Sequence, residues 1–386
     1  MSRELAAWRQ LVTADASALL EAADKCDARD VHAVARLRRH WSADHVRVAL
    51  QLTEARRKAA TKFPDHASIL LADPAGVEQA TSLIVAKHKA KRYRAAGASS
   101  VIDLCCGIGG DAMGFRFAGL DVLAVDSDPV RAWMAGCNAG CSTAGADVET
   151  IDVAEALIHI DPARRTEHGR IFKLRDTEPA PEVVARLLDR AAGGGVKLSP
   201  AVNLNELADA LPPGEVEFIS ENGKLVQTVL WTRPLAQAER RATRIAGEAI
   251  HSQQGVPARP PSGPLDRYLY TLDPALERSG LIDAVASPHN LTMPHPQLGL
   301  LTGPDPITSP WLTPFELLAE MPWQTKKVKR WLTEHNAGIV EVKTRGKAVD
   351  PDRTQADLRG KGDQPFTVFV LRRDRKRIAL ITRRCV

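Results

Sequence analysis

The sequence predicts an α/β fold built on a parallel, doubly wound sheet. In the middle of the 386-residue chain, short apolar runs alternate with helix-length segments, as such a sheet requires. Two of these apolar runs end in an acid, Asp103 and Asp126, and a glycine-rich turn follows the first. Because ligands lie at the carboxyl ends of such strands, we expect polar side chains to gather at one edge of the sheet.

The alternation of apolar runs also predicts where the elements lie. Residues 1–95 carry apolar side chains at helical spacing and predict a helical region. Asn222 and Gly223 favour a two-residue hairpin turn, so an antiparallel hairpin at 215–231 is expected to close the sheet. The expected strands are 100–105, 121–125, 148–151, 157–160 and 195–199, with helices at 111–117, 130–138 and 181–192.

The turn after the first strand has the form that holds an adenosine-bearing cofactor. Gly107 and Gly109 remove side chains where the backbone turns off a strand and approaches a ligand. Asp126 follows Gly107 by 19 residues, which suits a carboxylate against two ribose hydroxyls. The pyrophosphate of a dinucleotide prefers a helix N-terminus free of acids, but Asp111 stands in this turn. Asp103 and Asp111 therefore favour the cationic S-adenosylmethionine over a dinucleotide, although the glycine motif alone leaves both open.

Several strings of the sequence resemble a known family. DLCCGIGGD (Asp103–Asp111) and IDPARR (Ile160–Arg165) are similar to class I S-adenosylmethionine-dependent methyltransferases, which have a Rossmann-like sheet. The chain resembles more closely the bacterial group with a C-terminal THUMP-like domain, which is distantly similar to trimethylguanosine synthases. The resemblance runs from about residue 75 to the C-terminus. Its other strings are GVEQATS (Gly76–Ser82), KLSP (Lys197–Pro200), LDPALERSGLIDA (Leu272–Ala284) and EVKTRG (Glu341–Gly346).

The motif and the resemblance together indicate the cofactor-binding residues. In the family, a helix like GVEQATS helps to cover the cofactor, so the resemblance adds Thr81 to the candidate cofactor-binding residues. The resemblance gives Asp152 an adenine-contacting role, although only eight residues separate it from Asp161, too few for a strand and a full crossover helix. The candidates for S-adenosylmethionine binding are Asp103, Cys105, Gly107, Gly109, Asp111, Asp126, Ser127, Asp152 and Thr81.

The IDPARR string is the expected site of chemistry. Asp161 ends a strand, and Pro162 restricts the loop that follows it. In the amino-directed nucleic-acid methyltransferases, the comparable loop continues with a second proline and a base-stacking aromatic, whereas Ala163 and Arg164 stand here. A guanidinium can stack on a base or bind phosphate. Asp161, Pro162 and Arg164 are the candidate catalytic residues, with Asp161 as acceptor of the amine hydrogens; a simple Asp-Pro turn is the alternative.

The C-terminal part of the chain is strongly basic. From residue 324 onward there are 17 Lys and Arg against 7 Asp and Glu, although the whole chain has a net charge of only +5. Such a basic module suggests a nucleic-acid partner rather than a membrane. The alternative is that its charges only face solvent and bind no partner. Strands are expected at 337–344, 366–373 and 377–384, helices at 314–320 and 326–335, and a loop at 349–363. The candidate nucleic-acid contacts are Lys343, Arg345 and Lys347, expected on one face of an extended segment, with Arg359 and Lys361.

The composition excludes other classes of protein. Six cysteines without a framework spacing predict reduced thiols in a cytoplasmic protein, and neither a metal site nor a membrane anchor is expected. The basic segment KHKAKRYR (Lys87–Arg94) is interpreted as either a phosphate contact or a solvated helix face. We expect a helical N-terminal region (1–95), a methyltransferase domain (96–235), a connecting segment (236–310) and a small α+β, THUMP-like RNA-binding domain (311–386).

These observations predict an S-adenosylmethionine-dependent methyltransferase that modifies a base in ribosomal or transfer RNA, with an exocyclic amine as one acceptor. Two alternatives remain at this point. The chain could bind RNA with a methyltransferase fold that has lost turnover, which the absent aromatic after Asp161 suggests. It could also methylate DNA or a small molecule.

Overall fold

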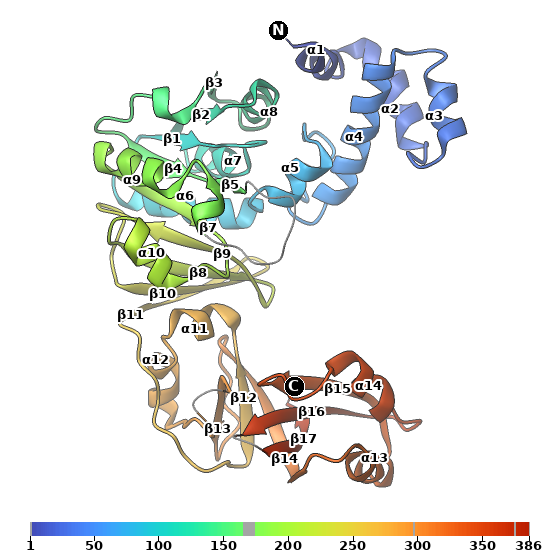
Figure 1. Cartoon of the computed structure of the whole chain (residues 1–386), viewed down its shortest axis with the longest axis vertical. Coiled ribbons are helices and arrows are strands. Elements are labelled where there is room, and N and C mark those ends of the chain that lie inside the picture. Colours follow the sequence, from blue (N-terminus) through green and yellow to red (C-terminus); the bar gives the residue numbers. More distant parts are fainter. Residues whose placement is uncertain (1, 165–173, 296–297, 374–375, 386) are drawn as a thin grey trace. The chain divides into compact units, whose positions relative to one another are not determined.

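The computed structural model describes residues 2–164, 174–295, 298–373 and 376–385 (Figure 1). Two compact units divide the chain. One comprises Met1–Glu215 with Gln227–Gln237, and the other comprises Val216–Val226 with Ala238–Val386. Within the described residues, no helix is both long enough and apolar enough to span a membrane.

The first unit begins with a helical region, as the apolar spacing predicted. Ser42 accepts a hydrogen bond from the His45 amide at 3.3 Å and so caps the longest of these helices, α4. The core includes Trp8 and Leu52 together with Met113 and Met134 from later helices, so the helical region packs onto the sheet layer of this unit. The helices are α1 (Arg3–Gln10), α2 (Ser17–Asp24), α3 (Val31–Leu37), α4 (Ala43–Ala59), α5 (Pro74–Gln79) and α6 (Leu83–Ala95).

The sheet of the first unit confirms the predicted α/β class. Its strands lie in the order β9-β7-β4-β1-β2-β3, and all neighbouring pairs are parallel except β9 with β7. The strands are β1 (Ser100–Leu104), β2 (Asp121–Asp126), β3 (Ser142–Gly145), β4 (Leu157–Ile160), β7 (Gly193–Leu198) and β9 (Lys224–Trp231). The helices are α7 (Gly110–Phe117), α8 (Pro129–Ala139), α9 (Pro181–Arg190) and α10 (Leu204–Ala210), and β5 (Ala163–Arg164) pairs with β6 (Thr177–Glu178).

One expected strand of this sheet is wrong. Val148–Thr150 forms a short 3-10 turn, and the strand before it is β3. The Asp147 carboxylate accepts the Glu149 amide at 3.0 Å, which holds the backbone in a turn. The expected hairpin is present: β9 follows β8 (Glu215–Glu221) after Asn222 and Gly223, whose φ angles of 50° and 76° are those of a two-residue turn.

The second unit contains residue 238 onward, and so nearly all of the segment 236–310, which we expected to connect two domains. Its strands β10 (Arg240–Ala246) and β11 (Ala249–Gly255) pair with each other, and β10 also pairs with β8. The remaining elements are α11 (Pro274–Ser279), α12 (Asp283–Ala286), β12 (Tyr268–Leu272) and β13 (Leu300–Gly303). The segment therefore contributes strands and helices to the second unit and is more than a connection.

The second unit also contains a six-stranded sheet in the order β13-β12-β14-β17-β16-β15. Two expectations are wrong here. Leu312–Pro322 forms β14 where a helix was expected, because its backbone pairs with both β12 and β17. Pro351–Leu358 forms α14 where a loop was expected, because Asp350 caps it and Pro351 fits its first turn. The other elements are α13 (Thr325–Glu334), β15 (Ala337–Arg345), β16 (Gln364–Arg373) and β17 (Lys376–Arg384).

Candidate active site

The glycine-rich turn after β1 has the unusual backbone that its residues suggested. Cys105, Gly107 and Gly109 have φ angles of 58°, 56° and 85°. A Cβ at Gly109 would lie 2.8 Å from the Ala135 Cα, so only glycine permits this approach of the turn to α8. A Cβ at Gly107 would meet no atom within 4 Å. Gly107 therefore borders open space, which leaves room for a ligand against the turn.

Asp126 ties the end of β2 to this turn. Its Oδ2 accepts the Gly107 amide at 2.9 Å, and its Oδ1 accepts the Asp128 amide at 2.9 Å. Burial raises the pKa of the Asp126 carboxyl. Each carboxylate oxygen can accept a further hydrogen bond. Asp126 can therefore hold the turn and accept from a ligand hydroxyl at the same time, and the neighbouring Ser127 is exposed.

Asp103 is a buried acid beneath the turn whose carboxyl group has no hydrogen-bond partner in the described residues. Its side chain is 0% exposed, and neither carboxylate oxygen has a hydrogen-bond partner among the described residues. Burial, reinforced by the neighbouring Asp111, raises its pKa well above the ordinary range. An unpaired buried carboxyl of this kind is costly for the protein unless a donor or a cation approaches it.

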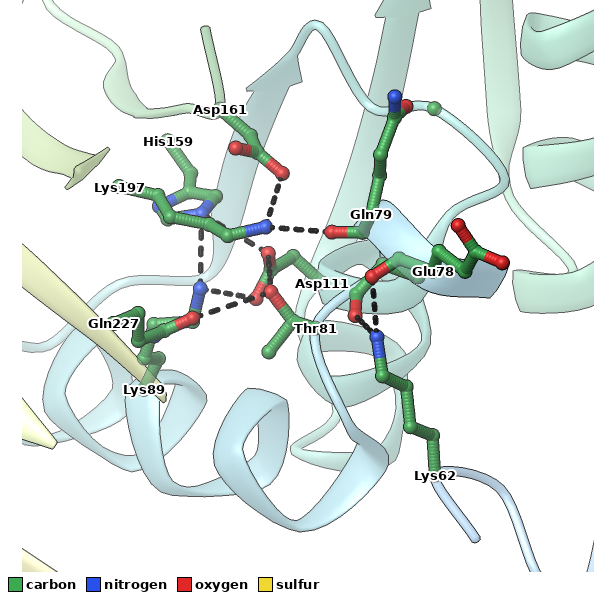
Figure 2. A network of polar contacts seen from close by, with 12 residues as sticks. Lys62, Glu78, Gln79, Thr81, Lys89, Asp111, His159, Asp161, Lys197 and Gln227 are labelled. Atoms are coloured by element: carbon green, nitrogen blue, oxygen red, sulfur yellow. Dashed lines mark hydrogen bonds and ion pairs between the residues drawn. The ribbon is translucent and has the colours of Figure 1, made fainter. Parts of the chain in front are cut away.

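Asp111 has a different role from the ligand contact that the sequence suggested. Figure 2 shows its carboxylate inside a polar network. Lys89 Nζ lies 2.5 Å from Oδ1, Thr81 Oγ1 donates to Oδ2 at 2.8 Å, and His159 Nε2 lies 3.3 Å from Oδ2. Burial would raise the pKa of Asp111, but Lys89 and His159 outweigh it and hold the pKa well below the ordinary value. Asp111 is therefore the counter-ion of a buried lysine.

Two members of this network were not predicted. Lys89 and His159 are both 0% exposed, and Lys89 Nζ lies 3.3 Å from His159 Nε2. Burial lowers the pKa of Lys89, and burial with the nearby Lys89 charge lowers the pKa of His159. The sequence signals were weak: Lys89 stands in the basic KHKAKRYR string, and His159 interrupts the apolar strand LIHI.

A second cation holds the predicted catalytic aspartate. Lys197, at the end of β7, donates from Nζ to Asp161 Oδ2 at 2.6 Å and to the Gln79 carbonyl at 3.0 Å (Figure 2). Its side chain is 15% exposed and that of Asp161 is 28% exposed. Burial would lower the pKa of Lys197, but Asp161 and Asp111 outweigh it and raise the pKa, so the ammonium stays charged near neutral pH. A lysine inside the otherwise apolar β7 was the signal for this role.

The end of α5 and the start of the loop to α6 are held by two lysines that donate to backbone carbonyls. Lys62 Nζ donates to the carbonyls of Val77, Glu78 and Ala80 at 2.8, 2.7 and 2.8 Å. Lys197 adds the carbonyl of Gln79, as described above. The loop also abuts the glycine turn, because a Cβ at Gly110 would lie 2.9 Å from the Thr81 carbonyl oxygen. Thr81 thus lies beside the turn.

The remaining predicted residues of this site are less well supported. Asp152 is exposed, its carboxylate accepts the Ala154 amide at 3.1 Å, and Arg190 lies 3.8 Å away. Pro162 is half-buried directly after Asp161. The backbone of Arg164 belongs to β5, but its side chain, like all of Arg165, lies outside the described residues.

The predicted nucleic-acid residues do not share one face of an extended segment. Lys343 and Arg345 alternate within β15, where Lys343 Nζ pairs with Glu341 at 2.7 Å and Arg345 Nε donates to the Leu298 carbonyl at 3.1 Å. The strand ends there, because Gly346 and Lys347 have φ angles of 68° and 50°. Lys347 therefore lies on a turn, and the alternation that joined these three residues stops at Arg345. Arg359 and Lys361 are exposed after α14.

Comparison with known proteins identifies the family. The chain is 31% identical over 338 residues to uncharacterized S-adenosylmethionine-dependent methyltransferases from two strains of Mycobacterium tuberculosis, covering 84% of this chain and 92% of each relative. The protein belongs to this methyltransferase family. Residues 312–384 of the methyltransferase match the THUMP domain-like family. A crystal structure from Porphyromonas gingivalis, provisionally named as a methyltransferase, shares its fold with a TM-score of 0.75 at 17% identity, covering 96% of this chain and 98% of that one.

The family confirms that the protein is an enzyme whose cofactor is S-adenosylmethionine. The residues of the site fit this molecule: the open space at Gly107 gives it room, and the unpaired Asp103 carboxyl suits its positive charge. The described residues contain no group of three His, Cys, Asp or Glu side chains that could hold a metal ion.

Proposed function

We propose that this methyltransferase modifies an amino group of a base in RNA, with ribosomal and transfer RNA as the first substrates to test. The observation that carries the proposal is the placement of Asp161. It follows β4 directly, its backbone amide donates to the Leu104 carbonyl of β1 at 3.1 Å, and its carboxylate is fixed by Lys197. Asp161 therefore stands at the carboxyl edge of the sheet, beside the strand that leads into the glycine turn.

The proposed chemistry depends on position more than on strong acid or base. Bound S-adenosylmethionine supplies a methyl group on a sulfonium, and transfer to an amine is an in-line displacement in which alignment lowers the barrier. Lys197 occupies Oδ2 of Asp161, and no described residue donates to Oδ1. Oδ1 can accept a hydrogen of the acceptor amine, which directs the nitrogen lone pair. Pro162 limits how far this carboxylate can move.

The proposed cofactor residues keep distinct roles. Asp103 would face the cationic end of the cofactor, the open side of Gly107 would lie against it, and Asp126 would accept from the ribose. Cys105 and Gly109 supply the backbone conformation of the turn. Asp111 and Thr81 would act through the network that holds the α5–α6 loop beside the turn. The exposure of Asp152 makes it the weakest member of this set.

The second unit supports the proposed substrate class. Its match to the THUMP domain-like family and its positive charge support RNA as the partner. The sequence-based candidates omitted α13, which buries Val328 and Leu332 and exposes Lys326, Lys327 and Arg330. Helix α14, with the exposed Arg353 near its start, packs beside α13. We include the lysines of α13 with Arg359 and Lys361 as the proposed phosphate-binding surface.

One experiment tests the proposal directly. Total RNA from a strain that lacks the gene is incubated with the purified protein and S-adenosylmethionine carrying a labelled methyl group. We expect the label in RNA, and mass spectrometry of the digested nucleosides would then name the modified base. Label that enters only DNA or small molecules would contradict the RNA assignment. An Asp161→Asn variant serves as the control, because it keeps the shape of the side chain and removes its charge.

A further inference from the structure

The exposed face of helix α6 carries cations that the proposed site does not use. Lys87, Lys91 and Arg94 follow one another at intervals of four and three residues, so they share one face of the helix. All three are exposed, and none forms an ion pair with a carboxylate in the described part of the chain. The set spans about 10 Å along the helix axis at about 1.5 Å per residue. We call these residues the α6 face.

An exposed aromatic ring lies against one end of this face. Phe117, at the end of α7, is 53% exposed, whereas every other Phe, Tyr and Trp in the described ranges is buried or half-buried. Lys87 Nζ lies 4.4 Å from the centre of the Phe117 ring, and the His66 ring meets it edge-on at 5.4 Å. The ring is therefore held in place by its neighbours while part of its surface remains open to a further group.

The combination of cations and a fixed exposed ring matches single-stranded nucleic acid. Unpaired cations attract a phosphate backbone, and an aromatic ring offers a stacking surface to any base. The face also leads from the site, because α6 begins at Leu83, two residues after Thr81. An acidic protein surface would use the cations but would have no need for an open ring.

We propose that the α6 face and Phe117 bind a single-stranded segment of the RNA substrate next to the nucleotide that is methylated. This inference rests on the proposed function, since it assumes an RNA substrate. It adds an RNA contact on the first unit, which also contains the proposed active site. It predicts that RNA affinity does not come from the THUMP-like module alone. The lysines and Phe117 act in binding, so their loss raises KM for RNA and leaves kcat close to its original value.

The test compares two charge-matched double variants of the full chain. Lys87→Gln with Lys91→Gln removes two cations of the α6 face, and Lys25→Gln with Lys224→Gln removes two exposed lysines elsewhere. Affinity for a fluorescent single-stranded RNA is measured over a range of salt concentrations. We expect the α6 pair to reduce the slope of log affinity against log salt by about 1.4, at roughly 0.7 for each lost phosphate contact, and the control pair to leave it unchanged. Phe117→Leu, which keeps an apolar side chain but removes the ring, should weaken binding about fivefold or more.

The outcomes separate this inference from the proposed function. Equal salt slopes for the two double variants, with Phe117→Leu binding like the wild type, would overturn the inference. If label still enters RNA in that case, the proposed function stands and the binding surface lies elsewhere. If the wild-type protein neither binds nor labels RNA, the proposed function fails and this inference fails with it. Circular dichroism of each variant confirms that the fold is retained.

Discussion

Replacing Lys197 by methionine tests how the proposed acceptor site is held. The change keeps the approximate length of the side chain and removes the ammonium that donates to Asp161 at 2.6 Å and to the Gln79 carbonyl at 3.0 Å. A hydrogen bond to a charged group contributes about 1.5–3 kcal/mol. At about 1.4 kcal/mol for each factor of ten, its loss should lower kcat/KM by about 10- to 150-fold. Binding of S-adenosylhomocysteine, measured by titration calorimetry, should change by no more than about threefold.

The matched control for this experiment is Lys62→Met. Lys62 donates to three carbonyls at the same end of α5 but does not contact Asp161. If Lys197 acts through Asp161, Lys197→Met lowers kcat, Lys197→Arg restores part of it, and Lys62→Met does neither. The double variant Asp161→Asn with Lys197→Met should be no slower than Asp161→Asn alone, because both changes remove one interaction. Identical kinetics for Lys197→Met and Lys62→Met would refute the reasoning, since the loop alone would then account for the effect.

Three further predictions concern the buried network and the turn. Asp111→Asn should lower the free energy of unfolding by about 3–5 kcal/mol in urea titrations, because Lys89 is left buried without its counter-ion. Adding Lys89→Met to this variant should recover part of the lost stability. If the losses of the two single variants simply add in the double variant, the two residues are not paired. Burial lowers the pKa of His159, so the unfolded chain binds a proton at this histidine more tightly than the folded chain does. The free energy of unfolding of the wild type should therefore fall by up to about 1.4 kcal/mol per pH unit as the pH drops below about 6.5. His159→Gln should lack this contribution to the pH dependence. Gly107→Asn should leave a folded protein, because asparagine tolerates the left-handed backbone of this position. It should bind S-adenosylhomocysteine at least about tenfold more weakly, because the added side chain enters the open space beside the turn. Unchanged binding by calorimetry would place the cofactor elsewhere.

Local patterns were enough to predict most of the sheet of the first unit, although they missed β3. The acids that end β1 and β2, the glycines between them and the Asn-Gly turn after β8 each act through backbone geometry within a few residues. Among the wrong elements, β14 is the one that distant strands decide. The helix formers of TPFELLAE predict a helix, but β12 and β17 supply backbone partners from both sides. The missed helix α14 is a different case, because the sequence contains its start signals, Asp350 and Pro351.

The site was predicted less completely than the fold, because a sequence does not show which side chains meet in space. Asp161 and Lys197 are separated by 36 residues, and Lys89 and His159 by 70, although each pair is in contact in the structure. The local signs were a lysine in one apolar strand, a histidine in another and the basic string that contains Lys89. Residues at the ends of neighbouring strands could be grouped from topology, but their buried partners on helix α6 could not.

The structure changes the reason why this turn suits a sulfonium cofactor. The sequence-based choice rested on two acids, Asp103 and Asp111. Lys89 neutralises Asp111, so that carboxylate does not repel a phosphate group. Asp103 has no such partner among the described residues, and its burial raises its pKa, so a nearby cation would stabilise its charged form. We therefore propose that the preference for a positively charged cofactor comes from Asp103 and not from Asp111, and Asp103→Asn should weaken binding of S-adenosylmethionine more than binding of the uncharged thioether S-adenosylhomocysteine. Equal losses for the two molecules in calorimetry would show that Asp103 acts through structure and not through charge.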